Sequence, residues 1–362
     1  MPVESSPGAA LTADVAERVR QEYLAERTAS MRFLPSEREL ATRLQVSRTT
    51  VRRALSILAD EGLVRAEHGR GYRTLARSIT PGAGSRMAIL LPRMSEELYA
   101  DAIGGEKAGA LQRVALENGW QVLFMMAGQL SPKGLADSLR EAESWGAVLL
   151  WDSAETYAAA REAGVPCVAL DSAEQSFAID YVLQDNFGGG LQAGEHLLGR
   201  GHRRIAWFGP VRESRHSLER FAGAGSAFTR AGMDVPGDLV FEPGKDPVGA
   251  ARQMLARADR PTAVLALWEG LAIATARAAG DLGLVLGKEL DLVGWTTEQN
   301  YPARVEREFR EGPAPAWILW DTGEMARIAV ARLAWHHRDP GLKPLRISVP
   351  TRLALPAQRK EA

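Results

Sequence analysis

The chain has 362 residues, of which 46% are hydrophobic and 25% are charged, a balance typical of a soluble globular protein. This length predicts two or three domains. No run of 18 or more apolar residues occurs, so we expect no membrane-spanning helix, and the first ten residues lack the pattern of a signal peptide. A single cysteine, Cys167, excludes a disulfide within one chain and a cysteine-based metal site, and it favours a cytoplasmic protein.

Charge is distributed unevenly along the chain. The net charge is −1, but the first 80 residues carry 13 arginines, no lysine and 10 acidic residues, while the remainder carries 31 basic and 35 acidic residues. The basic excess at the start of the chain predicts a polyanionic partner for that segment alone.

Helical periodicity predicts three helices in this basic segment. The first is expected over residues 15–26. A second opens at Ser36, which can form a capping box with Glu39, and a third opens at Ser47 and ends near Asp60. The third helix has an apolar stripe at helical spacing, made of Val51, Ala54, Leu55 and Leu58. Two helices joined by so short a turn form a helix-turn-helix.

Opposite the stripe, the third helix presents a polar face that consists of Arg48, Thr49, Arg52, Arg53 and Ser56. The first residues of such a helix reach base edges in the major groove, where an arginine can bind guanine or phosphate through two hydrogen bonds. Two strands are expected next, over residues 63–67 and 72–75, with a glycine-rich tip between them. This hairpin is a wing that would place Arg70 along the phosphates or in the minor groove.

Three motifs in this order resemble the DNA-binding domain of the GntR family: Leu34–Ala41, Val46–Leu55 and Gly69–Gly71. Residues Thr28–Phe33 depart from the family, which usually has a Gly-x-x-x-Pro-Gly turn there. The motif and the resemblance together assign operator contact to Ser36, Arg38, Ser47, Arg48, Thr49, Thr50, Arg52, Arg53, His68, Gly69, Arg70 and Gly71.

After a linker rich in small residues, short apolar strands alternate with helical patterns from Met87 onward, which predicts an α/β fold with parallel sheets. This part has about 275 residues, which is more than a single hydrophobic core accommodates, so two lobes are expected. Strands are predicted over residues 87–91, 121–125, 147–151, 166–170, 181–184, 204–208, 239–241, 262–268, 290–295, 316–320 and 347–355. The main helices between them are predicted over 99–118, 135–145, 217–231, 248–258 and 323–337.

Five motifs of this part resemble the LacI-type effector-binding domain: His202–Gly209, Glu219–Gly223, Pro261–Val264, Leu292–Trp295 and Val349–Leu353. The resemblance implies a periplasmic-binding-protein-like body, in which two doubly wound parallel sheets are joined by crossovers near residues 185, 296 and 340. A GntR-type head on such a body resembles the arabinose-repressor subgroup. The expected organisation is a disordered start (1–10), a winged helix-turn-helix (11–76), a linker (77–85), the body (86–357) and a tail (358–362).

Ligands of open α/β sheets bind beyond the C-terminal ends of the strands. That rule nominates Ser95, Tyr99, Trp151, Asp152, Asp171, Asp185, Trp268, Glu269, Trp295, Thr297 and Trp320. The LacI-type resemblance adds Arg220 as the arginine that binds the effector. Aromatic faces with carboxylates and one arginine suit a small polar ring compound. Trp268-Glu269 and Thr296-Thr297 occupy the positions at which that family usually has Asn-Asp and Asp-Asp. This departure argues against a plain sugar as the effector and is compatible with a less hydroxylated or bulkier ligand.

The residues alone leave two other functional classes open, an enzyme and a protein whose body only dimerises. GntR-type heads also occur on PLP-dependent bodies, but none of the six lysines sits at a strand end in a plausible pocket, and no G-x-S-x-G elbow occurs. Gly188–Gly190 could form a phosphate site, although close packing is the simpler role. A body that only dimerises is the third class.

We therefore expect a repressor rather than an enzyme, without cofactor or metal. Its expected partners are a double-stranded DNA operator, a sugar-like effector and a second copy of the chain.

Overall fold

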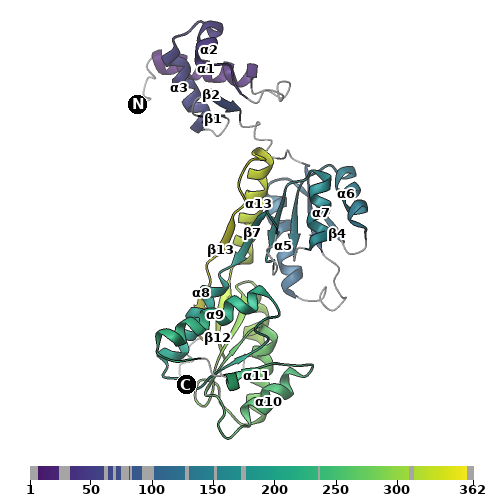
Figure 1. Ribbon diagram of the computed structural model, residues 1–362, viewed down its shortest axis with the longest axis vertical. Coiled ribbons are helices and arrows are strands. Elements are labelled where there is room, and N and C mark those ends of the chain that lie inside the picture. The colour runs from purple at the N-terminus through teal and green to yellow at the C-terminus, as the bar shows by residue number, and fades with distance from the viewer. Residues whose placement is uncertain are drawn as a thin grey trace. The chain divides into compact units, whose positions relative to one another are not determined.

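The computed structural model describes residues 7–23, 33–60, 64–67, 71–74, 81, 84–91, 102–126, 130–150, 153–172, 177–234, 237–309 and 314–356. The chain divides into two compact units (Figure 1). One consists of Met1–Gly84 with Ala334–Lys343, and the other of Ser85–Leu333 with Pro344–Ala362. Within the described residues, no helix is both long enough and apolar enough to cross a membrane.

The first unit contains the expected three helices and a hairpin. Its elements are α1 (Pro7–Tyr23), α2 (Glu37–Leu44), α3 (Arg48–Asp60), β1 (Val64–Glu67) and β2 (Gly71–Thr74), and the two strands pair antiparallel. Helix α1 starts earlier than predicted, inside the stretch expected to be disordered. The predicted apolar stripe of α3 forms the core with α1 and α2, through Val15, Val19, Leu40, Leu44, Val51, Ala54, Leu55 and Leu58.

Local capping explains where α2 and α3 begin. The Ser36 hydroxyl accepts from the Glu39 amide at 3.3 Å, and the Glu39 carboxylate accepts from the Ser36 amide at 2.8 Å, so the predicted capping box is confirmed. Gln45, with φ of 55°, ends α2 in the left-handed region. The Ser47 hydroxyl then accepts from the Thr50 amide at 3.1 Å and starts α3.

The second unit holds two six-stranded sheets. The first has the order β13-β7-β6-β5-β3-β4 and is parallel throughout. Its strands are β3 (Arg86–Leu91), β4 (Gln121–Met126), β5 (Ser144–Leu150), β6 (Cys167–Leu170), β7 (Asp180–Gln184) and β13 (Arg346–Val349). The inner strands β3, β5 and β6 are buried over almost their whole length, and they therefore read as continuous apolar runs in the sequence.

The second sheet has the order β14-β12-β11-β10-β8-β9, and only its edge strand β14 is antiparallel. Its strands are β8 (Ile205–Phe208), β9 (Val240–Phe241), β10 (Ala263–Ala266), β11 (Asp291–Thr297), β12 (Ala316–Trp320) and β14 (Arg352–Ala354). The prediction of two parallel α/β sheets is therefore confirmed.

Helices connect the strands of both sheets. They are α5 (Ala102–Glu117), α6 (Pro132–Glu141), α7 (Ala154–Ala163), α8 (Asn186–Gly199), α9 (Arg215–Arg230), α10 (Pro247–Leu255), α11 (Glu269–Asp281), α12 (Glu306–Glu308) and α13 (Thr322–Arg338), with a 3-10 turn η3 (Gly237–Leu239) and a π-helical turn η4 (Tyr301–Val305). Helix α8 packs on α9, and α10 packs on α11. Figure 1 shows these two pairs on opposite sides of the second sheet.

The chain passes between the two sheets three times. It leaves the first sheet at Asp185, between β7 and α8, and returns through α13 and the following loop, before β13. The crossover expected near residue 296 does not occur there, because β11 and β12 are neighbours in the same sheet. The third passage lies at Pro350-Thr351, which divides the single strand predicted over 347–355 into β13 and β14.

Two of these crossover segments are hydrogen-bonded to one another. The Asp185 amide donates to the Val349 carbonyl at 2.8 Å. From α8, the side-chain amide of Gln192 donates to the Thr351 carbonyl at 3.2 Å. The Thr351 hydroxyl lies within 3.5 Å of the Asp185 carbonyl.

The glycine run that opens α8 serves close packing. A Cβ added to Gly190 would lie 2.1 Å from the Arg220 carbonyl oxygen of α9, and one added to Gly189 would lie 2.6 Å from the Trp295 ring. On the facing helix, a Cβ at Gly223 would lie 2.1 Å from the Phe187 carbonyl oxygen. The backbones of α8 and α9 approach too closely for any larger side chain at these positions.

Candidate functional site: an arginine-bearing helix and a buried arginine box

The polar face of α3 carries exposed arginines. Arg38 of α2 and Arg48 and Arg53 of α3 are exposed, and no salt bridge involving them is found in the described part of the chain. Thr49 is also exposed beside Arg48. This face therefore offers unpaired cations and a hydroxyl to an external partner, at the end of the helix where a recognition helix contacts bases.

Several predicted DNA-contacting residues also have structural roles in the helix-turn-helix. Ser36, Ser47 and Thr50 take part in the two helix caps described above. Arg52 of α3 donates two hydrogen bonds to Glu37 of α2, from Nε at 3.1 Å and Nη2 at 2.8 Å, and so ties the two helices together. Its hydrogen bonds and charge hold the pKa of Glu37 below its usual value.

The predicted wing is described only in part. Gly71 opens β2 with φ of 91°, in the left-handed region that favours glycine. The Leu34 amide donates to the Tyr72 carbonyl at 2.8 Å, which fixes the hairpin to the chain before α2. The tip residues His68, Gly69 and Arg70 lie outside the described residues.

In the second unit, Arg220 of α9 lies in a box of three indoles and is completely buried. Its guanidinium carbon lies 4.1, 4.6 and 5.5 Å from the ring centroids of Trp295 in β11, Trp268 just after β10 and Trp320 at the end of β12. Burial lowers the pKa of Arg220 to about 9, so the side chain stays a cation at neutral pH. We call these four residues the arginine box.

Two acceptors fix the orientation of the Arg220 side chain. Its Nε donates to Asn186 Oδ1 at 2.8 Å, and its Nη1 donates to the Leu267 carbonyl at 2.9 Å. The remaining nitrogen, Nη2, is buried and makes no hydrogen bond to the described residues. The arginine is thus held rigidly, with one donor group left for another molecule.

A second group of buried ionisable side chains brings the two sheets together. Lys107 of α5 is ion-paired with Asp171, which follows β6 and has φ of 55°. His216 of α9 lies 3.4 Å from the same carboxylate. Burial, with the charges of Arg220 and Lys107, lowers the pKa of His216 to about 3, so this imidazole is neutral.

Threonine hydroxyls satisfy two further carboxylates. Thr297, at the end of β11, donates to Glu106 of α5 at 2.7 Å, and Thr322 donates to the same carboxylate. Thr296 donates to the buried Glu269, the first residue of α11. Burial raises the pKa of Glu106 above its usual value.

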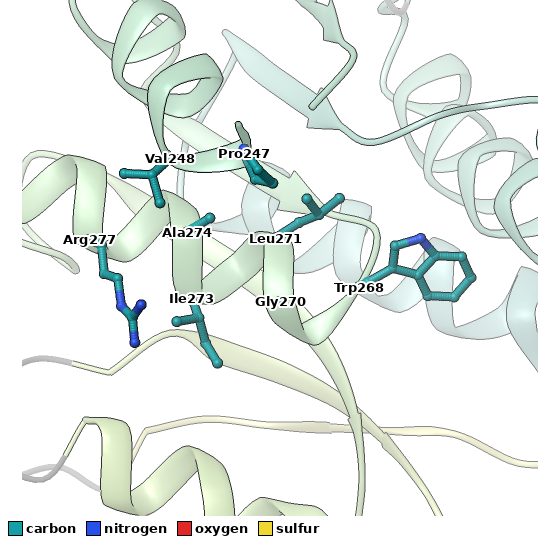
Figure 2. A pocket seen from close by; sticks show the side chains of 8 residues that line it. All are labelled: Pro247, Val248, Trp268, Gly270, Leu271, Ile273, Ala274 and Arg277. Atoms are coloured by element: carbon teal, nitrogen blue, oxygen red, sulfur yellow. The ribbon is translucent and has the colours of Figure 1, made fainter. Parts of the chain in front are cut away.

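Two hollows meet at Trp268, the first between α10 and α11 and the second after the ends of β8 and β9. One has a volume of about 400 Å³ and is lined by Pro247, Val248, Trp268, Gly270, Leu271, Ile273, Ala274 and Arg277 (Figure 2). The other has a volume of about 560 Å³ and is lined by Pro210, Glu213, Glu242, Pro243, Gly244, Trp268 and Leu271. Figure 2 shows the Trp268 indole extending away from the other lining side chains. One face of this sheet end is therefore hollowed next to the arginine box.

Comparison with known families agrees with this division of the chain. Residues 11–73 match the bacterial regulatory proteins of the gntR family, and residues 195–355 match the periplasmic binding protein-like domain. The chain thus has a segment similar to the gntR family followed by a segment similar to the periplasmic binding protein-like domain.

Among related sequences, the HTH-type transcriptional regulator CelR of Thermobifida fusca is 30% identical over 189 residues, which cover 49% of this chain and 53% of CelR. The HTH-type transcriptional repressor PurR of Escherichia coli is 30% identical over 140 residues, which cover 38% of this chain and 41% of PurR. The matched region thus spans about half or less of the length of these relatives.

Solved structures share the fold. A CelR–cellobiose complex superposes with a TM-score of 0.62 at 21% identity and covers 89% of this chain and 99% of that chain. A regulatory protein of the LacI family from Chloroflexus aggregans superposes with a TM-score of 0.63 at 22% identity and covers 74% and 96% of the two chains.

Within the second unit, the structure brings together a subset of the nominated effector residues. Arg220, Trp268, Trp295 and Trp320 form the arginine box, and Glu269 and Thr297 lie at the ends of its strands. Asp171 lies in the neighbouring ionic group. Asp185 caps α8 by accepting from the Gly188 amide at 2.8 Å. Four nominated residues, Ser95, Tyr99, Trp151 and Asp152, lie outside the described residues.

Sequence reasoning missed Asn186, Lys107, His216 and Glu106. Asn186 follows the nominated Asp185 directly, so the pair of polar residues after β7 could have indicated that Asn186 belongs to the site. Lys107 and Glu106 lie within a helix, away from any strand end, and His216 lies among polar residues that read as a helix start. Their burial comes from packing between distant segments, which no local pattern encodes.

Proposed function

We propose that this protein is a sequence-specific DNA-binding transcription regulator, acting as a repressor, whose affinity for its operator is controlled by a small-molecule effector. The observation that carries the proposal is the α3 face, where Arg48, Thr49 and Arg53 are exposed directly after a capped helix-turn-helix turn. The relatives named as HTH-type transcriptional regulators support it.

The chemistry of this face suits duplex DNA. Arginine can bind guanine O6 and N7 through two hydrogen bonds, and it can neutralise a backbone phosphate. The apolar stripe of α3 is fully buried against α1 and α2, so the arginines have a rigid support. Phosphate contacts from this head would supply affinity, and contacts to base edges would supply specificity.

The effector site of the proposal is the arginine box with the hollows beside Trp268. The box and the hollow lined by Glu213 and Glu242 lie at the C-terminal ends of strands of the second sheet, where α/β sheets bind ligands. A cellobiose complex of the related CelR supports a carbohydrate-derived effector for this chain. No described residue group requires a catalytic role in this scheme.

Control of DNA binding requires a dimer and two conformations. One winged helix reads a short half-site, so we propose a homodimer on an operator with two-fold symmetry. The effector would favour one conformation of the body and so change the fraction of dimers competent to bind DNA. A decisive switch between two such states needs an affinity difference of about 10⁴-fold.

Operator selection with the full chain tests the proposal. A library of random duplexes is enriched on the purified protein, and binding of the enriched sequence is compared with that of a scrambled duplex at fixed salt. We expect a two-fold symmetric consensus bound at least about 10³-fold more tightly than the scrambled duplex. Equal affinity for both duplexes would refute sequence-specific regulation.

A further inference from the structure

The arginine box contains a buried cation without a matching anion. Arg220 is completely buried, and no carboxylate forms an ion pair with it among the described residues. The faces of Trp268, Trp295 and Trp320 stabilise the guanidinium by cation–π contact. Such contacts offset only part of the cost of burying a charge, which in proteins is normally met by a paired anion.

The three described carboxylates near the box are already bound to other side chains. Glu269 accepts from Thr296, and Glu106 accepts from Thr297 and Thr322. Asp171 is ion-paired with Lys107. The side chain that faces Arg220 most directly, Asn186, is a neutral amide at 2.8 Å from its Nε atom. Among the described residues, the Arg220 charge is therefore uncompensated.

The unsatisfied polar atoms at the box are hydrogen-bond donors. Four buried nitrogens make no hydrogen bond to the described residues: Nη2 of Arg220, Nδ2 of Asn186 and Nε1 of Trp295 and Trp320. None of these groups can accept a hydrogen bond. Buried donors are normally satisfied, so this set calls for a molecule that supplies acceptor oxygens.

Trp268 is the box residue through which a ligand can enter. Trp295 and Trp320 are 1% and 3% exposed, whereas Trp268 is partly exposed and lines both hollows. Rotation of its indole away from Arg220 would connect the guanidinium with those hollows. Trp268 is the N-cap residue of α11 and makes no side-chain capping hydrogen bond that would hold the ring in place.

We propose that the effector carries a carboxylate, which binds Arg220 in the arginine box in place of the Trp268 ring. This inference rests on the proposed function and specifies the chemical class of its effector. A carboxylate brings one negative charge to one cation and offers only acceptors to the four donors. A phosphate monoester carries close to two charges and would leave one uncompensated in the box.

The test compares acids with their neutral parents on the full-length protein. Isothermal titration is performed with gluconate and glucose, galacturonate and galactose, and cellobionate and cellobiose, at matched ionic strength. We expect at least one acid to bind at least tenfold more tightly than its parent sugar. Glucose 6-phosphate serves as the phosphate probe and should bind more weakly than that acid.

The matched variant is Asn186→Asp, which changes one atom and places a carboxylate next to Arg220. It should raise the melting temperature without ligand, because it pairs the buried charge, and it should reduce the preference for the acid at least tenfold. Asn118→Asp, a helix residue outside the box, serves as the control and should leave that preference unchanged. Because the variants retain Arg220, the comparison does not depend on a mutant that fails to fold.

Each outcome decides the proposal. Equal or tighter binding of a neutral parent, tighter binding of the phosphate, no binding by any acid, or an unchanged preference in Asn186→Asp would each overturn it. The proposed function is judged separately by operator binding. An acid that binds without altering operator affinity would refute effector control but would support the carboxylate site. A neutral sugar that releases the protein from DNA would support effector control but would refute the carboxylate site.

Discussion

Arg52 of α3 and Glu37 of α2 form a two-point ion pair on the surface proposed to meet DNA, with N–O distances of 2.8 and 3.1 Å. The Arg52 side chain is 65% exposed, whereas that of Glu37 is 19% exposed. The pair stabilises the packing of the two helices and at the same time occupies an arginine that could bind a phosphate. Structure and DNA binding therefore compete for one side chain.

Glu37→Gln should tighten binding to any duplex several-fold at low salt, because it releases Arg52 and removes a negative charge. If Arg52 gains a phosphate contact, the slope of log K against log salt should steepen by roughly 0.9. Fluorescence anisotropy across a salt series measures both quantities. In the double variant Glu37→Gln/Arg52→Ala the steeper slope should vanish, and its persistence would mean that Arg52 is not the residue released.

Arg48→Ala should weaken binding to the selected operator by about 1–3 kcal/mol and relax the preference at one base pair. Arg48 is exposed at the first position of α3, so its loss leaves the head folded. Gel-shift titrations with operator variants provide the measurement. Arg140→Ala, which removes an exposed arginine from α6, is the charge-matched control. An operator affinity equal to that of the wild type would remove Arg48 from the interface.

Gly190→Ala should strongly destabilise the body, because the added methyl group would lie 2.1 Å from the Arg220 carbonyl oxygen and would force α8 away from α9. Gly199→Ala, in the same helix, meets nothing within 4 Å and should be neutral or stabilising by up to about 1 kcal/mol. Calorimetric melting of both variants makes the comparison. Similar melting temperatures for the two would contradict the close approach of the helices.

Acid should destabilise the body through His216. Its pKa is about 3 in the folded protein, against an ordinary value of 6.5, because it is buried near Arg220 and Lys107. The unfolded chain therefore binds this proton more strongly, and the stability from neutral His216 is lost as the pH falls from about 6.5 towards about 3. The Asp171 carboxylate at 3.4 Å works against this shift but does not cancel it.

His216→Gln tests this assignment. Melting temperatures of the wild type and the variant, measured between pH 7 and pH 4, should converge as the pH falls, because only the wild type loses the contribution of His216. Parallel pH profiles for the two proteins would show that another group controls acid sensitivity.

The helix-turn-helix and the strands could be predicted from the sequence because their determinants are local. The Ser36–Glu39 capping box, the apolar stripe of α3 and the short apolar strands each depend on residues a few positions apart. The nomination of the tryptophans after β10 and β12 also used a local rule, that ligands bind beyond the ends of parallel strands.

The tertiary structure alone decided how distant segments meet. It divided one predicted strand at Pro350 between two sheets, and it paired Lys107 with Asp171 across 64 positions of sequence. It also placed Arg220 against Asn186 and three indoles without a carboxylate. Burial and ion pairing of this kind depend on which segments pack together in space, and a linear pattern carries no information on that packing.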